Sequence, residues 1–383
     1  MKPVVKKIII VSGAVIIALG IYLLMRALFS SPSSPENQNS TLPISSENGG
    51  NQPSAVNSGT QNQTNSLPTL KKISESAVFD FIVRADSKDV YYFGIDGKTY
   101  SAKEGPDLSV SSQTMNALNF IEADPTAQKV LAAFGDPQSP SWGIFDFNGK
   151  SWHPLPAEIL NATWGSSNNE LIATVKNGNN LNLSLVDLKN NPPSYKTLIK
   201  DFRLKDVKFA FRSPQSLLIF EKGNSTYTSR VWQLDLKTLS LNLLINNERG
   251  LVIGFSDDKK NAFGFSLPNK FKIFDNSFQK GILTFFTTLP SKCNNTASTT
   301  FCFVPQILPP NQTLPDDYFQ KSFRSTDGLY TYNQTTGAFR QILLNGSEIT
   351  EPLDVYHPQY LGDRFYFINR FDRGLYALNL KID

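Results

Sequence analysis

Residues 161–187 read NATWGSSNNELIATVKNGNNLNLSLVD, and this stretch contains the unit from which the fold is built. An apolar run leads into the polar turn at 165–170, a second apolar run follows, and a third strand of alternating character ends in Asp187. Alternation with a period of two, interrupted by Gly, Asn and Ser, is typical of antiparallel strands joined by short turns. The stretch therefore predicts a small meander of strands.

The same unit occurs seven times in the chain. The first two strands of each copy are expected at 78–93, 118–134, 161–175, 207–220, 251–265, 293–304 and 355–368. Strand repeats of about 40 to 60 residues predict four-stranded blades that close into a propeller. We therefore predict an all-β, seven-bladed β-propeller over residues 67–383. Six blades are the alternative, because the sixth copy is degenerate and the first is short; a β-sandwich does not predict this periodicity.

The last copy stops after its third strand. Residues 67–73, which precede the first copy, belong to no blade in this assignment. We expect this segment to supply the missing outer strand of the last blade. Such pairing would close the ring and remove an exposed sheet edge.

An apolar segment opens the chain. Residues 8–25 carry no charge, and three lysines precede them. As a helix these residues span about 27 Å, close to the thickness of a bilayer core. We therefore predict a transmembrane helix over 8–28 that enters the lipid bilayer. Because positive charges are enriched on the cytoplasmic side of a membrane span, residues 1–7 are expected to be cytoplasmic and the rest of the chain extracytoplasmic. A cleaved signal peptide is the alternative, but the apolar run is long for that role and no clear cleavage site follows.

Residues 29–66 consist mainly of Ser, Asn, Gln, Pro, Gly and Thr, with Glu36 and Glu47 as the only charges. Such a composition cannot bury enough apolar surface to offset the entropy of ordering. We predict a disordered linker with a mean reach on the order of 35 Å.

The net charge of +4 divides unevenly along the chain. Without the four basic residues of the tail and helix and the two acids of the linker, 33 basic and 31 acidic residues remain, a balance of +2. No long run of one sign occurs among them. Nucleic acid is therefore not a predicted partner, since it would require clustered Lys and Arg.

The two cysteines, Cys293 and Cys302, both fall in the predicted extracytoplasmic region. An even pair in that compartment is most simply a disulfide, here between the adjacent strands of the sixth hairpin. Its loop is short, so we expect a stabilisation of about 2–3 kcal/mol. Metal binding is not favoured, because no His or acidic cluster accompanies the pair.

These strand–turn–strand units resemble the TolB-like and WD-type propeller repeats, in which the first turn reads Trp-Ser-Pro-Asp-Gly-Lys. Fragments of that turn remain at 164–167, 211–214 and 255–259. The chain is also similar to uncharacterised, membrane-anchored bacterial propellers, which share a Cys-flanked hairpin ending in Pro, here at Pro305, and a Pro-Asp-Asp-aromatic loop, here at 315–318. The resemblance covers residues 67–383. It implies the fold and topology and carries no catalytic residue.

Motifs of catalysis are absent from the sequence. The two histidines, His153 and His357, are interpreted as surface or packed structural residues. Two P-loop-like stretches, at 95–99 and 148–151, lie in strand–turn–strand context, whereas a phosphate loop requires a helix N-terminus. An Asp box at 146–152 is not favoured, because its Asp-to-Gly spacing is one residue too long. The sequence therefore assigns no catalytic residue, cofactor site or metal site.

The longest insertion, residues 306–326, is the candidate for recognition. It is rich in proline and contains four adjacent acidic and aromatic residues, namely Asp316, Asp317, Tyr318 and Phe319. Long loops on a rigid scaffold often carry binding, and acidic groups beside aromatic ones suit contact with a peptide or glycan. An ordinary surface insertion folded against its own blade is the alternative.

Together these features favour a non-catalytic binding or scaffold module for a protein, peptide or glycan of the cell envelope. A degenerate glycosidase- or peptidase-associated propeller is the alternative, and an assembly factor for envelope transport is a third hypothesis by fold analogy alone. A catalytic propeller should gather acidic, Arg or Tyr side chains on one rim within hydrogen-bonding reach. A binding module should instead present an exposed aromatic patch, with Tyr318 and Phe319 as its expected members.

Overall fold

The computed structural model describes residues 69–380, apart from 85, 103–105, 205, 257–258, 260, 276–277, 279–280, 297 and 344–348. The chain forms two compact units, residues 1–64 and 65–383, and only the second contains described residues. The predicted tail, the predicted transmembrane helix 8–28 and the predicted linker 29–66 lie outside them. Within the described residues, no helix is both long and apolar enough to cross a membrane.

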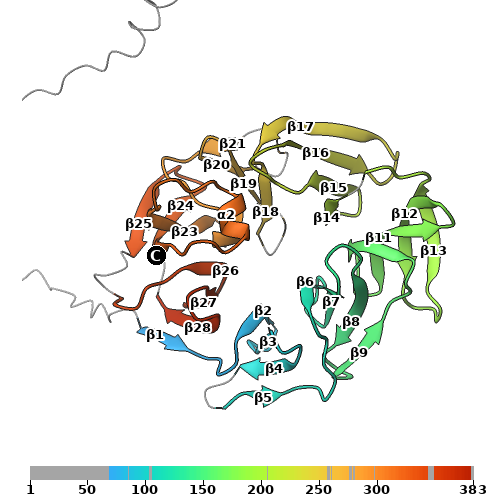
Figure 1. The fold of residues 1–383 in the computed structure, drawn as a ribbon, viewed down its shortest axis with the longest axis horizontal. Helices are drawn as coiled ribbons and strands as arrows, with labels where there is room; N and C mark the ends of the chain where they lie inside the picture. The colour runs from blue at the N-terminus through green and yellow to red at the C-terminus, as the bar shows by residue number, and fades with distance from the viewer. Residues whose placement is uncertain are drawn as a thin grey trace, which may run out of the picture. The chain divides into compact units, whose positions relative to one another are not determined.

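Seven antiparallel sheets of four strands follow one another around a ring (Figure 1). Blade 1 contains β2 (Val78–Val83), β3 (Val90–Gly94), β4 (Thr99–Ala102) and β5 (Leu108–Ser109). Blade 2 contains β6 (Leu118–Ala123), β7 (Lys129–Phe134), β8 (Ser141–Asp146) and β9 (Ser151–Pro154). Blade 3 contains β10 (Ile159–Trp164), β11 (Glu170–Asn177), β12 (Asn180–Asp187) and β13 (Ser194–Ile199).

The remaining blades have the same strand order. Blade 4 contains β14 (Val207–Ser213), β15 (Ser216–Glu221), β16 (Thr228–Asp235) and β17 (Leu241–Arg249). Blade 5 contains β18 (Val252–Phe255), β19 (Ala262–Ser266), β20 (Lys270–Phe274) and β21 (Gly281–Leu283). Blade 6 contains β22 (Cys293–Asn295), β23 (Thr299–Ile307), β24 (Thr326–Asn333) and β25 (Phe339–Leu343). Blade 7 contains β26 (Val355–Leu361), β27 (Arg364–Asn369), β28 (Gly374–Asn379) and β1 (Thr69–Lys72). Two short helices, η1 (Pro290–Lys292) and α2 (Asp316–Phe319), flank the strands of blade 6.

The seven-bladed propeller is confirmed, and the six-bladed alternative is wrong. Blade 6 looked degenerate in the sequence because its first strand, β22, is only three residues long. The ring closes as expected, since β1 pairs with β28, with Thr69 opposite Asn379 and Lys72 opposite Tyr376. The two ends of the domain therefore complete one sheet, and this pairing removes a free edge.

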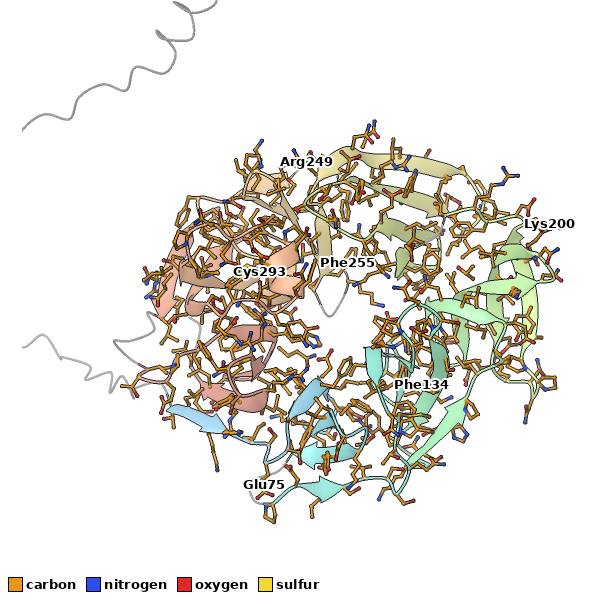
Figure 2. All side chains as sticks on the ribbon, viewed as in Figure 1. Glu75, Phe134, Lys200, Arg249, Phe255 and Cys293 are labelled. Atoms are coloured by element: carbon orange, nitrogen blue, oxygen red, sulfur yellow. A yellow bond between two sulfur atoms is a disulfide. The ribbon has the colours of Figure 1, made fainter. Side chains whose placement is uncertain are left out.

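Burial differs between the strands of one blade. The second strand β11 is buried from Leu171 to Val175, because the neighbouring blades cover both of its faces, whereas the outer strand β13 is mostly exposed. Figure 2 places Phe255, the last residue of β18, on the inner side of the ring and Lys200, just after β13, at its outer edge. The core thus lies between blades rather than within one layer.

The P-loop-like stretch at 95–99 is a hairpin turn between β3 and β4. Gly97 has a φ of +79°, and a Cβ at this position would lie 2.3 Å from the carbonyl oxygen of Met115. Glycine is thus required by the backbone rather than by a phosphate.

Each blade has two ends with different connections. The first and second strands, and the third and fourth, are joined at one end, which we call the AB face. The second and third strands are joined at the opposite end, which we call the BC face, where each first strand also begins. The candidate insertion connects β23 to β24 and therefore lies on the BC face.

Candidate functional site

A disulfide lies at the base of the insertion. Cys293 in β22 is directly opposite Cys302 in β23, and the two are joined with a Cα–Cα distance of 4.1 Å. Both cysteines are buried among aromatic side chains of blades 5 and 6. The first two strands of blade 6 are thus cross-linked just before β23 continues into the insertion.

The two predicted acids of the insertion bind within the protein. The carboxylate of Asp316 accepts hydrogen bonds from the backbone N–H of Ser225 at 3.0 Å and from its hydroxyl at 2.5 Å. Ser225 belongs to the β15–β16 connection, so this contact ties the insertion of blade 6 to blade 4. Asp317 accepts a hydrogen bond from the N–H of Thr313 at 2.6 Å and closes a turn within the insertion.

Tyr318 is buried, with only 4% of its surface exposed. The guanidinium carbon of Arg370 lies 3.8 Å from the centre of its ring, and Arg370 Nη2 donates a hydrogen bond to the Tyr318 carbonyl at 3.1 Å. The expectation of an exposed Tyr318 is therefore wrong, because cation–π stacking and this hydrogen bond fix the ring beneath the loop. Phe319 is 50% exposed, as a binding residue would be.

Beneath Tyr318 lies a buried ion cluster formed by Lys292, Asp327, Asp354 and Arg370. Lys292 Nζ donates to Asp327 at 2.5 Å and to Asp354 at 2.6 Å, and Arg370 Nη1 donates to Asp354 at 3.1 Å. The four side chains are between 0% and 9% exposed. Two cations and two carboxylates balance, as burial of charge requires.

The ion cluster joins segments that are far apart in the sequence. Lys292 ends η1 ahead of blade 6, Asp327 is the second residue of β24, Asp354 precedes β26, and Arg370 follows β27. All four positions lie on the BC face, at the junction of blades 6 and 7. No local spacing links these residues, so the sequence alone does not predict the cluster.

The electrostatics of this cluster keep both Lys292 and Tyr318 protonated. Burial alone would lower the pKa of Lys292, but the negative charges of Asp327 and Asp354 outweigh it and raise this pKa, so the amine stays protonated. Burial also raises the pKa of Tyr318, which keeps the phenol neutral. The gathering of acids, Arg and Tyr expected of a catalytic rim is thus present, but its members bind one another and expose almost no surface to a substrate.

His357 links blade 7 to blade 1. Its Nδ1 lies 2.6 Å from the carboxylate of Asp80, and its Nε2 lies 3.3 Å from Gln359 Nε2. The oxygen of the Gln359 amide accepts the N–H of Val83, so its nitrogen faces the histidine as a donor. The imidazole of His357 therefore lies between the carboxylate of Asp80 and the amide of Gln359.

A second ion pair crosses the ring on the AB side. Lys259, in the β18–β19 turn, pairs with Glu122 of β6, which also accepts a hydrogen bond from the Thr163 hydroxyl at 2.9 Å. Arg212 Nε donates to the Lys259 carbonyl at 3.3 Å. These groups join blades 2, 3, 4 and 5 and are bound to one another.

A group of exposed aromatic and positively charged side chains lies on the BC face, beside the insertion. Two loops, 320–325 and 370–373, meet where Arg324 Nε donates to the Arg370 carbonyl at 2.9 Å. These loops, together with the last residue of α2, carry two half-exposed aromatic residues and three cations, which we call the BC-face patch: Phe319, Lys321, Arg324, Phe371 and Arg373. Within the described part of the chain, no carboxylate forms an ion pair with any of the three cations.

Comparison with protein-family models and with curated protein sequences finds no match. Solved structures do match. Oligogalacturonate lyase from Vibrio parahaemolyticus has a TM-score of 0.55 at 10% identity over 82% of this chain and 93% of its own. The Cps50 (Swd1) β-propeller domain of Myceliophteria thermophila has a TM-score of 0.52 at 9% identity over 82% and 100%. The tricorn protease has a TM-score of 0.50 at 10% identity, with 82% of this chain but 34% of that chain covered.

At such low identity these likenesses show the β-propeller fold alone. One matched oligogalacturonate lyase structure is a complex with manganese. Among the described residues of this chain, no group of three or more His, Cys, Asp or Glu side chains is placed to hold a metal ion.

Proposed function

We propose that this chain is a non-catalytic binding or scaffold module of the cell envelope that engages a protein, peptide or glycan through its BC face. The BC-face patch is the observation that carries the proposal. It combines two half-exposed phenylalanines, Phe319 and Phe371, with cations that have no carboxylate partner among the described residues. Aromatic residues, phenylalanine included, and arginine are enriched in the cores of protein–protein interfaces.

The loops that present the patch are held in place, which lowers the entropy lost on binding. Asp316 fixes the insertion to blade 4, and Arg370 fixes it to blade 7. A further hydrogen bond, from Arg324 to the Arg370 carbonyl, joins the two loops directly. This internal bonding gives the acids and Tyr318 a supporting role and leaves Phe319 as the recognition residue of the predicted four.

The proposal places the propeller on the extracytoplasmic side, anchored in the bilayer by residues 8–28. It is supported by the uncharged run at 8–25 and the lysines before it. The chain enters the propeller at Thr69, which pairs with Asn379 near the AB turn of blade 7. This entry point is at the opposite end of the strands from the patch.

Site-specific photo-crosslinking tests the binding role. A photoreactive amino acid replaces Phe319 in the full chain, and the same amino acid replaces Tyr195, an exposed residue of the outer strand β13. We expect adducts in intact cells that form from position 319 and not from position 195. Identical adducts from both positions would contradict a binding role for the BC face.

A separate measurement tests the anchor. The full chain should remain with membranes after alkaline carbonate extraction, whereas a chain that lacks residues 1–28 should be released. Release of both proteins would contradict the anchor and leave the binding role untouched.

A further inference from the structure

We infer that the BC-face patch binds an acidic peptide segment that also carries large apolar side chains. This inference rests on the proposed function and names the occupant of the same surface. Its basis is the combination of uncompensated positive charge with exposed phenylalanine on two loops that are bonded to each other.

The pKa of Lys321 reflects its burial and the positive charge of the surrounding arginines. Burial lowers the pKa of Lys321, and so do the positive charges of Arg373, Arg370 and Arg324. A lysine beside a carboxylate would experience the opposite effect. Protonated Lys321 therefore stands in a positive potential that an anionic ligand would relieve.

The neighbouring acids are already bound elsewhere. Asp372 forms an ion pair with Lys72 at 2.7 Å, Asp354 pairs with Arg370 in the buried cluster, and Asp317 binds the backbone of the insertion. Arg370 is thus neutralised, while Lys321, Arg324 and Arg373 are not. The surface offers up to three positive charges to a ligand.

The apolar part of the patch favours a peptide over a glycan. Phe319 is 50% exposed and Phe371 is 42% exposed, and neither ring has a group that forms strong hydrogen bonds. An acidic polysaccharide would match the cations but would give the two rings little apolar surface to bury. A peptide that alternates Asp or Glu with Leu or Phe would satisfy both parts at once.

The backbone conformation of two patch residues indicates substitutions that should fold normally. Lys321 has a φ of +60° and Arg373 a φ of +58°, a left-handed conformation that asparagine adopts more readily than lysine or arginine. Lys321→Asn and Arg373→Asn therefore remove charge without adding backbone strain. Lys88→Asn is the matched control, because Lys88 also has a φ of +58° but lies in the AB turn of blade 1.

The test is selection of a random dodecapeptide library, displayed on phage, against the full chain in detergent. We expect the enriched peptides to combine Asp or Glu with large apolar residues. In fluorescence anisotropy their affinity should fall about tenfold or more for the double variant Lys321→Asn/Arg373→Asn and for Phe319→Ser, and should weaken with added salt. The Lys88→Asn variant should bind as the unchanged chain does.

Three outcomes would overturn the inference: no enrichment of acidic, apolar peptides; enriched peptides that bind all variants equally; or binding of a labelled polyuronate, but of no peptide, through the same residues. In the third case the proposed binding role would stand and only its occupant would change. Identical crosslinked adducts from positions 319 and 195 would instead contradict the proposed function itself.

Discussion

The single side chain of Lys292 connects several elements of the ring. Its ammonium donates to Asp327, Asp354 and the carbonyl of Val355, and so joins η1, blade 6 and blade 7 at one point. Buried ion pairs contribute little net stability compared with well-packed apolar residues, but removal of one partner leaves the other charge buried and uncompensated. The ion cluster should therefore be far more sensitive to single substitutions than to paired ones.

We expect Lys292→Met to lower the free energy of unfolding by about 3–5 kcal/mol, because Asp327 is left buried without its cation. The double variant Lys292→Met/Asp327→Asn removes one charge of each sign and keeps an oxygen for the N–H of Val355. It should recover much of the loss, since Arg370 and Asp354 remain paired. Urea denaturation of the three proteins measures both effects. Equal stabilities for the single and double variants would show that the charges are not closely coupled.

At the scale of elements, Asp316 is the link between the insertion and the rest of the ring. We expect Asp316→Ala to increase hydrogen exchange in residues 308–325 and in the β15–β16 connection, because both hydrogen bonds to Ser225 are lost. Exchange in the strands of blades 1 to 3 should not change. Hydrogen–deuterium exchange with mass spectrometry provides the measurement.

Asp317→Ala is the matched control for that experiment, since Asp317 binds only within the insertion among the contacts described. It should loosen residues 311–319 and leave the connection around Ser225 protected. The assigned link would be wrong if both variants altered exchange around Ser225 to the same extent.

The disulfide is the covalent link of blade 6. Replacement of both Cys293 and Cys302 by Ala should lower the free energy of unfolding by about 2–3 kcal/mol, the entropy expected for a closed loop of this length, with a further contribution from the lost packing. Chemical denaturation with and without a reducing agent measures it. Reduction should destabilise the unchanged chain and have no effect on the double variant; an equal effect on both would place the cause outside this bond.

The sequence predicted the repeated elements far better than the site. Each hairpin is local, so turns such as 165–170 and strands such as β12 could be found from alternation within about 25 residues. The closing strand was also predictable, because the seventh copy lacked its fourth strand. The burial of Tyr318 was not, since it depends on Arg370, 52 residues further along the chain. The BC-face patch was missed for the same reason, because Phe371 and Arg373 belong to another blade.

The molecule as a whole should be sensitive to alkali. Burial raises the pKa of Tyr92, Tyr356 and Tyr376, the last to about 12, and the buried carboxylates raise that of Lys292 against the effect of its own burial. Each group holds its proton more tightly in the folded state than in the unfolded one. Above about pH 10 the unfolded state therefore loses protons first, and stability should fall as the pH rises.

Urea midpoints measured from pH 8 to pH 11 test this dependence. They should be nearly constant up to about pH 9 and should then decrease. Tyr376→Phe removes one of the titrating groups, so the decrease should be smaller in that variant. A flat profile, or an unchanged slope in Tyr376→Phe, would contradict the assigned cause.

Ring closure is the property on which all seven blades depend, and β1 (Thr69–Lys72) provides it. A chain that lacks residues 1–72 should lose the fourth strand of blade 7 together with the Lys72–Asp372 ion pair, whereas a chain that lacks only residues 1–64 should keep both. The shorter chain would expose the edge of β28 to pairing with other molecules. We expect its thermal midpoint to be lower by roughly 3 °C, as a loss of about 2 kcal/mol would produce in a domain of this size, and we expect it to self-associate. Differential scanning fluorimetry and size-exclusion chromatography compare the two chains. Equal midpoints and a monomeric short chain would mean that the six complete blades hold the ring without the strand that joins its ends.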